Sequence, residues 1–328
     1  MKFIVFLLIL IALALTSLVV GVTDGAWDAL LHVMTPGAET IADDKTDAAT
    51  VLVTSRIPRT LALILAGVGL SVSGLILQML ARNKFVEPHT VGASESAALG
   101  LLIVLLITPG LPIIARMLVA TGFAMAGSAL FLLLLQRIPW RTPYIVPLVG
   151  LMLGGVIEAA TNFVGYRTDM MQALSNWTVG DFSSILQGRY ELLWLSLGLT
   201  IAAYFAADRF TVAAMGETVS TSLGLNYRRL VALGLVVVSL MTAVVIVTSG
   251  MIPFVGLIVP NLVTLILGDN MRRNLPWVAA TGAILLLASD IVGRLILHPY
   301  ELPVGTTMGV VGGAVFLALL LRNMRHDR

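Results

Sequence analysis

Long apolar runs, separated by short polar segments, recur from one end of the chain to the other. Each run approaches the roughly 20 residues that an α-helix needs to cross the hydrocarbon core of a bilayer. The runs lack the apolar–polar alternation of a lipid-facing barrel strand, so helices are the expected spanning structure. The pattern predicts ten membrane-spanning helices, over residues 3–22, 60–80, 91–108, 113–136, 144–166, 190–207, 229–249, 252–268, 277–297 and 304–321.

Composition supports a membrane protein. Of the 328 residues, 58% are hydrophobic and only 12% are charged, whereas soluble domains average about 25% charged residues. We therefore expect one all-α, polytopic membrane domain over residues 1–328. The first apolar run resembles a signal peptide. However, it lacks a clear small-x-small cleavage site and is long enough to cross a bilayer, so we expect it to be a retained helix.

Several kinds of chemistry are absent from the sequence. The chain has no cysteine, which excludes disulfides, thiolate metal sites and thiol nucleophiles. It contains no P-loop, no zinc-binding HExxH and no GxSxG nucleophile elbow. We therefore expect no catalytic residue, no bound metal and no cofactor, and any energy from ATP must come from a separate subunit.

The distribution of lysine and arginine predicts the orientation. With ten spans both termini share one side, and that side collects most of the 20 lysines and arginines. Cytoplasmic loops carry this excess of positive charge, so both termini are expected in the cytoplasm. The acidic segment 23–54, with a short helix expected at 27–32, is then extracytoplasmic, and the polar loop 208–228 is cytoplasmic.

Arginines on the outer side run against this trend. Arg56 and Arg59 flank Pro58 at the start of the second expected helix. Cations at a helix N-terminus oppose the macrodipole, so these two need acidic partners or access to lipid headgroups. Asp290 and Arg294 stand one turn apart on the ninth helix, where they form an internal ion pair, join the outer arginines, or do both.

Polar residues inside the expected helices allow a packing role or a pathway role. Ser71 and Ser73 stand among glycines, and small residues let membrane helices approach closely. Gln78 follows on the same helix. Glu158 and Asn162 lie one turn apart inside the fifth helix. An intramembrane carboxylate is a functional candidate, although the absence of an obvious cation partner slightly favours a neutral, hydrogen-bonded Glu158.

The expected cytoplasmic loop contains two small motifs, Gly216-Glu217 and Leu223-Gly224. They fit two short helices with a tight turn. Such a loop suits the groove of a cytoplasmic partner protein, and it equally suits a solvated connector.

Several motifs stand in a fixed order along nearly the whole chain: Arg56-Ile57-Pro58-Arg59; Ser73-Gly74 with Gln78; Asn83, Glu87-Pro88 and Gly92; Gly180-Asp181; residues 250–260; Gly268-Asp269; Asp290 with Arg294; and residues 301–305. Each motif alone is weak. The ordered set resembles the FecCD family of ABC importer permeases, which includes the vitamin B12 permease.

The resemblance implies a set of partners. It implies a ten-helix subunit that pairs with a second permease, identical or paralogous, above two cytoplasmic ATPase subunits and below an extracytoplasmic solute-binding protein. Arg56, Arg59 and Arg294 match positions that meet glutamates of the binding protein. Residues 216–224 match the segment that contacts the ATPase. No nucleic-acid partner is implied.

Three positions depart from the family pattern: Lys84 replaces a proline, Asn261 a histidine and Ser220 an alanine. Residues 84–86, 165–169 and 190–191 are similar to a subgroup that imports ferric catecholate or mixed-ligand siderophores. The resemblance therefore implies a ferric-siderophore permease of the bacterial cytoplasmic membrane. Vitamin B12 or haem is the alternative cargo. A proton-coupled carrier using Glu158 and Asp290 is the alternative mechanism.

Overall fold

The computed structural model describes residues 2–20, 50–137, 145–297 and 300–326. Within these ranges the chain is all-helical, with twelve α-helices, two short 3₁₀ segments and one π-helical turn. The α-helices are α1 Lys2–Val19, α4 Ile57–Ala81, α5 Ala93–Ile107, α6 Ile113–Gln136, α7 Ile145–Arg167, α8 Met171–Thr178, α9 Trp194–Ala214, α10 Glu217–Ser222, α11 Tyr227–Ser249, α12 Val255–Leu267, α13 Met271–Ile296 and α14 Val304–His326. The other segments are η1 Leu52–Arg56, η2 His89–Val91 and η3 Glu191–Leu193.

Each of the ten expected spans contains a helix. Six helices of the described chain are long and apolar enough to cross a membrane: α4 (with η1), α6, α7, α9 (with η3), α11 and α13. Four shorter apolar helices, α1, α5, α12 and α14, occupy the remaining expected positions. The all-helical prediction is confirmed for the described residues. The short helix expected at 27–32 lies outside them.

Helix boundaries differ from the prediction where local chemistry overrides hydropathy. α12 begins at Val255 rather than 252 because Phe254 adopts a left-handed conformation with φ of 69°. α13 begins at Met271 rather than 277, since the Asn270 side chain accepts a hydrogen bond from the Arg273 N–H and caps the helix ahead of Pro276. α9 continues to Ala214, which shortens the expected loop, and this loop holds one short helix, α10, instead of two.

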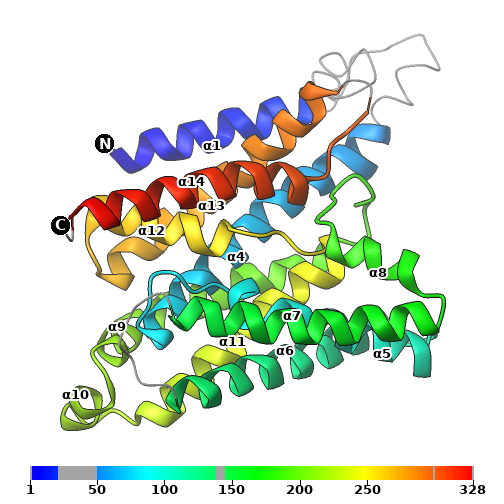
Figure 1. Ribbon diagram of the computed structural model, residues 1–328. Helices are drawn as coiled ribbons and strands as arrows, with labels where there is room; N and C mark the ends of the chain where they lie inside the picture. The colour runs from blue at the N-terminus through cyan, green and yellow to red at the C-terminus, as the bar shows by residue number, and fades with distance from the viewer. Residues whose placement is uncertain (1, 21–49, 138–144, 298–299, 327–328) are drawn as a thin grey trace.

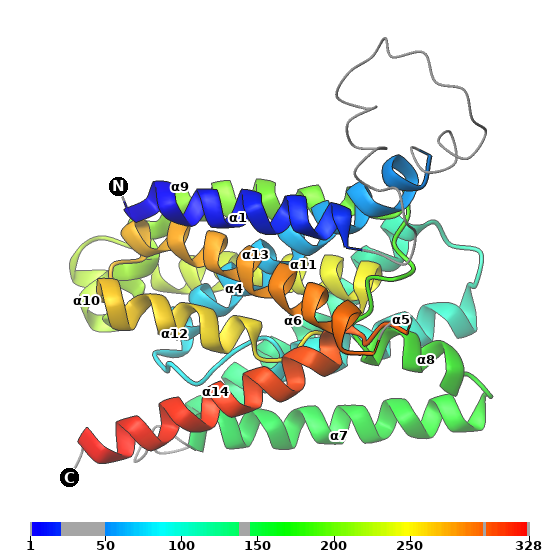
Figure 2. The ribbon, with the colours of Figure 1, turned by 90° about the horizontal axis from the view of Figure 1, so that it is seen from above.

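α4 forms the centre of the bundle (Figure 1, Figure 2). It packs against α9, α11, α12 and α13, and its glycines make the packing close. A Cβ at Gly67 would collide with the backbone of Gly282, and one at Gly74 would collide with Gly256. This agrees with the packing interpretation of the small residues of this helix.

The polar residues of α4 take part in this packing. Ser71 and Ser73 are fully buried. The Ser71 hydroxyl donates to the carbonyls of Gly67 (2.7 Å) and Val278 (3.1 Å), and Ser73 donates to Leu70 (2.8 Å). Gln78 donates to the Gly256 carbonyl at 3.2 Å. All three side chains thus hold α4 to its own turns or its neighbours.

The two chain ends lie at the same end of the bundle, and α10 projects there too (Figure 1, Figure 2). The last turn of α1, the start of α4 and α8 lie at the opposite end (Figure 1). This arrangement separates the two groups of candidate residues. The arginines belong to one end and the α10 segment to the other.

Candidate functional site

The structure brings Arg59, Asp290, Arg294 and Glu301 into one ionic group, called here the arginine cluster. Arg59 pairs with Asp290 and with Glu301, each at 2.7 Å. Arg294 pairs with the other oxygen of Asp290, which confirms the ion pair predicted within α13. The Asp290 side chain is fully buried, whereas that of Glu301 is 26% exposed. The two positive and two negative charges of the arginine cluster therefore offset each other within the chain.

Two arginines also hold the last turn of α1. Arg294 donates to the carbonyls of Ser17 (2.9 Å) and Val20 (2.8 Å), and Arg56 donates to the carbonyl of Leu18 (2.8 Å). The last carbonyls of a helix lack intrahelical partners and carry partial negative charge, so arginine is well suited to them. The sequence expected Arg56, Arg59 and Arg294 to lie together, and they do. It did not foresee that the chain itself supplies their acceptors.

The α10 segment has the exposed surface expected of a contact loop. Glu217 and Leu223 are exposed, with Leu223 at 63%. Gly216 and Gly224 have φ of 106° and 76°, a region that disfavours every side chain, and a Cβ at Gly224 would meet open space. Ser220 is buried, and its hydroxyl donates to the Gly216 carbonyl at 2.7 Å. Ser220, where the family pattern has alanine, therefore uses its hydroxyl to hold the first turn of α10.

The other two departures meet each other. The Asn261 side chain donates to the Lys84 carbonyl at 2.7 Å, and the Lys84 ammonium lies 3.1 Å from Asp269. Nearby, the carboxylate of Glu87 accepts from the backbone N–H groups of Phe254 (3.0 Å) and Leu257 (3.1 Å). A carboxylate at a helix N-terminus satisfies orphan donors and the dipole, so Glu87 fixes the start of α12.

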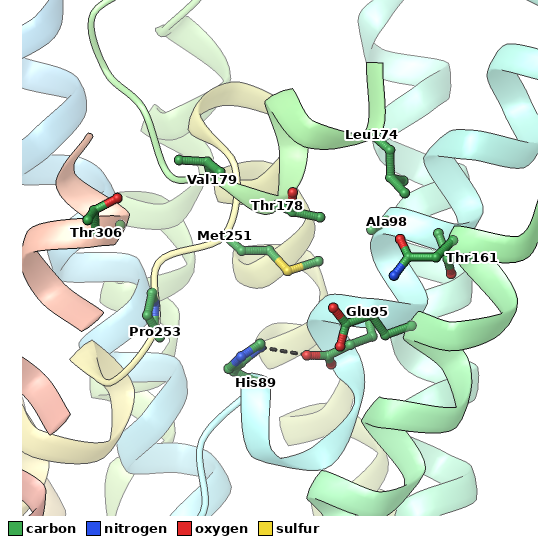
Figure 3. A pocket seen from close by; sticks show the side chains of 13 residues that line it. His89, Glu95, Ala98, Thr161, Leu174, Thr178, Val179, Met251, Pro253 and Thr306 are labelled. Carbon is green, nitrogen blue, oxygen red and sulfur yellow. Dashed lines mark ion pairs between the residues drawn. The ribbon is translucent and has the colours of Figure 1, made fainter. Parts of the chain in front are cut away.

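A cavity of about 300 Å³ lies among η2, α5, α7, α8 and the first turn of α14. Its polar wall includes His89, Glu95, Glu158 and Asn162. The Nδ1 atom of His89 lies 2.6 Å from Glu95 Oε1 (Figure 3). Glu158 is exposed on α7. The structure therefore places Glu158 on a cavity wall, in contrast to the buried, hydrogen-bonded state that the sequence slightly favoured.

The sequence pattern does not single out His89 and Glu95. Residues 83–97 read only as a polar turn followed by an irregular helix start. A histidine two residues after an acidic one, with another carboxylate six residues further, was the available signal. This signal indicates a site only in the folded protein, where α7 and α8 close the cavity around His89 and Glu95.

Comparison with known proteins gives consistent matches over nearly the whole chain. The model of the FecCD transport family matches residues 7–322. The petrobactin import system permease protein YclN of Bacillus subtilis is 45% identical over 320 residues, covering 97% of this chain and 98% of that protein. The ferric-anguibactin transport system permease protein FatD of Vibrio anguillarum is 42% identical over 274 residues, covering 84% and 87%.

More distant matches include a relative in sequence and a solved structure of similar fold. The vitamin B12 import system permease protein BtuC of Citrobacter koseri is 32% identical and covers 82% of each chain. A solved structure described as an inward-facing conformation of a metal-chelate type ABC transporter superposes with a TM-score of 0.77 over 97% of both chains. Its sequence identity of 23% makes that likeness one of fold.

Proposed function

The chain belongs to the FecCD transport family, and from that premise we propose that it is the permease subunit of an ATP-driven importer of a ferric siderophore. The observation that carries the proposal is the 45% identity, over almost the full length of both chains, to a petrobactin permease. The subunit moves its cargo and performs no chemistry on it. ATP hydrolysis belongs to a separate subunit.

Relative similarity favours an iron chelate over vitamin B12. The two siderophore permeases compared above are 45% and 42% identical to this chain, whereas the vitamin B12 permease is 32% identical. The same relatives support an ABC importer and leave the proton-coupled carrier without support. Glu158 and Asp290 then need no role as coupling sites.

The proposed topology has ten spans, with both termini and α10 in the cytoplasm of a bacterial cell. It is supported by ten apolar helices among the described residues and by the position of both chain ends beside α10 (Figure 1). The arginine cluster then faces the outside. A reporter fused to the C-terminus should be active only in its cytoplasmic form, and activity of the periplasmic form would invert the topology.

In the proposed assembly, two permease subunits stand on two ATPases and receive a solute-binding protein from outside. Arg56, Arg59 and Arg294 are the proposed contacts for acidic residues of that protein. Glu301 is the more exposed partner of Arg59, so an incoming carboxylate would share Arg59 with it. Such charge complementarity mainly sets encounter rate and register.

The proposed coupling runs through α10. Closure of the ATPases below would push on exposed Glu217 and Leu223, and α10 is joined directly to α9 and α11. Those helices pack against α4. A push on α10 would therefore pass into the bundle as a rigid-body shift, which changes the opening of the pathway between the two permeases.

Replacement of Gly224 tests this coupling. Gly224→Leu should leave the complex assembled but reduce transport per ATP hydrolysed several-fold, because φ of 76° is strained for a leucine and the turn beside α10 must shift. Binding-protein-stimulated ATPase activity and uptake should be measured on the same preparation. Exposed Ser222→Ala in the same segment is the control, and an unchanged ratio in Gly224→Leu contradicts the coupling route.

Uptake by whole cells tests the cargo. Cells lacking their own siderophore permeases should accumulate labelled iron from ferric petrobactin when this chain and its partner subunits are expressed. Inactivation of the ATPase should abolish uptake. Transport of vitamin B12 but of no iron chelate would overturn the cargo, and uptake that survives ATPase inactivation but collapses with the proton gradient would overturn the mechanism.

A further inference from the structure

Glu95, which lines the cavity beside η2, has a buried carboxylate oxygen that lacks a partner in the described part of the chain. Glu95 lies in the first turn of α5 and is 6% exposed. Its Oε1 faces His89 at 2.6 Å, whereas Oε2 makes no hydrogen bond to any residue in the described part of the chain. Leaving a buried, charged acceptor unpaired is costly. His89 accounts for one oxygen, and the other oxygen needs a donor.

A second carboxylate faces the same cavity. Gly154 of α7 lies against the Glu95 carboxyl, since a Cβ built there would sit 3.4 Å from Glu95 Cδ. Glu158 stands four residues further along α7, and residues at i and i+4 share a helix face. Glu158 lines the cavity with Glu95. The two carboxylates therefore approach one space from two different helices.

The charge of this space is negative in either protonation state of His89. Among the described residues that line the cavity, His89 is the one that can carry a positive charge, and none is a lysine or an arginine. If His89 is protonated, it offsets one of the two carboxylates and one negative charge remains. If His89 is neutral, both remain. A cation is therefore the occupant that the site favours.

The geometry selects an amine over a metal ion. In the described residues no group of three or more histidine, aspartate or glutamate side chains is arranged to hold a metal. An ammonium carries three donors and suits several acceptors. Glu95, Glu158 and Asn162 supply acceptor oxygens among the lining residues. Glu95 Oε2 is covered in this structure and has no partner among the described residues, so a ligand reaches it through a small shift of the wall.

The size of the cavity limits what enters it. A volume of about 300 Å³ is at the lower end for small-molecule sites, so it admits an arm of a chelate and not a whole one. We infer that this cavity is a transit site for a protonated amine arm of the transported chelate, held between Glu95 and Glu158. The inference rests on the proposed function as an iron-chelate permease. Because Glu158 is exposed, its attraction for the amine is weak, and weak binding lets the cargo leave the site, as a conducting path requires.

A matched pair of cargoes tests this inference. The probes are two ferric chelates with the same iron-binding groups, one with a free alkylamine arm and one with that amine acetylated. The complete importer, with its ATPases and binding protein, is reconstituted in proteoliposomes. The wild type should move the amine form about tenfold faster, since a hydrogen bond to a charged group contributes at least about that factor.

Two variants locate the preference. Glu158→Gln and Glu95→Gln should each slow the amine form several-fold and leave the acetylated form unchanged. Asp208→Asn, which removes an exposed carboxylate far from the cavity, is the control and should change neither rate. Binding-protein-stimulated ATPase activity, measured in parallel, shows that each variant is assembled. Because Glu158 is exposed, its variant remains informative if Glu95→Gln fails to fold.

The outcomes separate this inference from the proposed function. Equal transport of both chelates by the wild type overturns the amine site alone. Equal slowing of both chelates by Glu158→Gln also overturns it, since that pattern indicates a general structural role. Absence of any iron transport by an active wild-type complex overturns the proposed function, and the amine site with it.

Discussion

The arginine cluster and the cavity beside η2 are two ionic regions of one bundle, and they differ in how their charges are satisfied. In the arginine cluster, Asp290 receives both Arg59 and Arg294, and Glu301 receives Arg59. In the cavity, Glu95 has an oxygen without a partner among the described residues, and Glu158 stands exposed. Buried charge that is paired within the chain holds a fold together, even though Arg294 Nε has no hydrogen-bond partner among the described residues. Charge left open at a cavity wall is available to a ligand.

Removal of Asp290 should give the largest effect on stability. Asp290→Ala leaves Arg59 and Arg294 buried without their shared partner, and breaking a buried pair in this way costs about 3–5 kcal/mol. The thermal unfolding midpoint of the purified complex in detergent measures the loss. Glu301→Ala is the control and should cost less, because Glu301 is partly exposed and serves one arginine. If Asp290→Ala were as stable as the wild type, the arginine cluster would not stabilise the fold.

Reversal of Arg56 should give an intermediate effect, mainly on binding, with a smaller loss of stability because the bond to the Leu18 carbonyl is lost. Arg56→Glu is expected to weaken binding-protein affinity about tenfold at low salt, or about 1.4 kcal/mol, with a smaller loss at high salt because exposed charges are screened. Binding to nanodisc-embedded complex at two salt concentrations measures it. Arg56→Lys keeps the charge and should stay near wild type. If Arg56→Glu bound the binding protein with unchanged affinity, Arg56 would not contact that protein and would interact only within this chain.

Neutralisation of Glu158 should give the smallest effect on stability. Glu158→Gln is expected to stay within about 0.5 kcal/mol of wild type, since substitutions at exposed positions rarely exceed that. The same thermal measurement as for Asp290→Ala makes the two regions directly comparable. A loss in Glu158→Gln as large as that of Asp290→Ala would show that both regions are structural.

Hydropathy located the helices because apolar length is a local property of sequence. It missed α8, whose eight residues are too short to span. It also misplaced the start of α12, where Phe254 turns left-handed and Glu87, 167 residues earlier in the chain, caps the helix. A helix cap that comes from a distant segment cannot be predicted from the local hydropathy pattern.

For the candidate sites, too, the sequence indicated local features but not the contacts between distant segments. The ordered motifs indicated that Arg56, Arg59 and Arg294 converge, but not that Asp290, Glu301 and the end of α1 would already bind them. Glu158 stood out as an intramembrane carboxylate. Its neighbours His89 and Glu95 come from another segment, and only the folded arrangement of η2, α5 and α7 reveals that the three share one cavity.

Transport by the purified assembly tests the account most directly. The chain, its partner permease and the two ATPases are reconstituted in proteoliposomes without a proton gradient, with binding protein loaded with labelled ferric petrobactin on the side of the arginine cluster. The account predicts iron accumulation on the α10 side that requires ATP and stops when the ATPase is inactivated. Accumulation without ATP, or none at all from an assembly that hydrolyses ATP in response to the loaded binding protein, would contradict it.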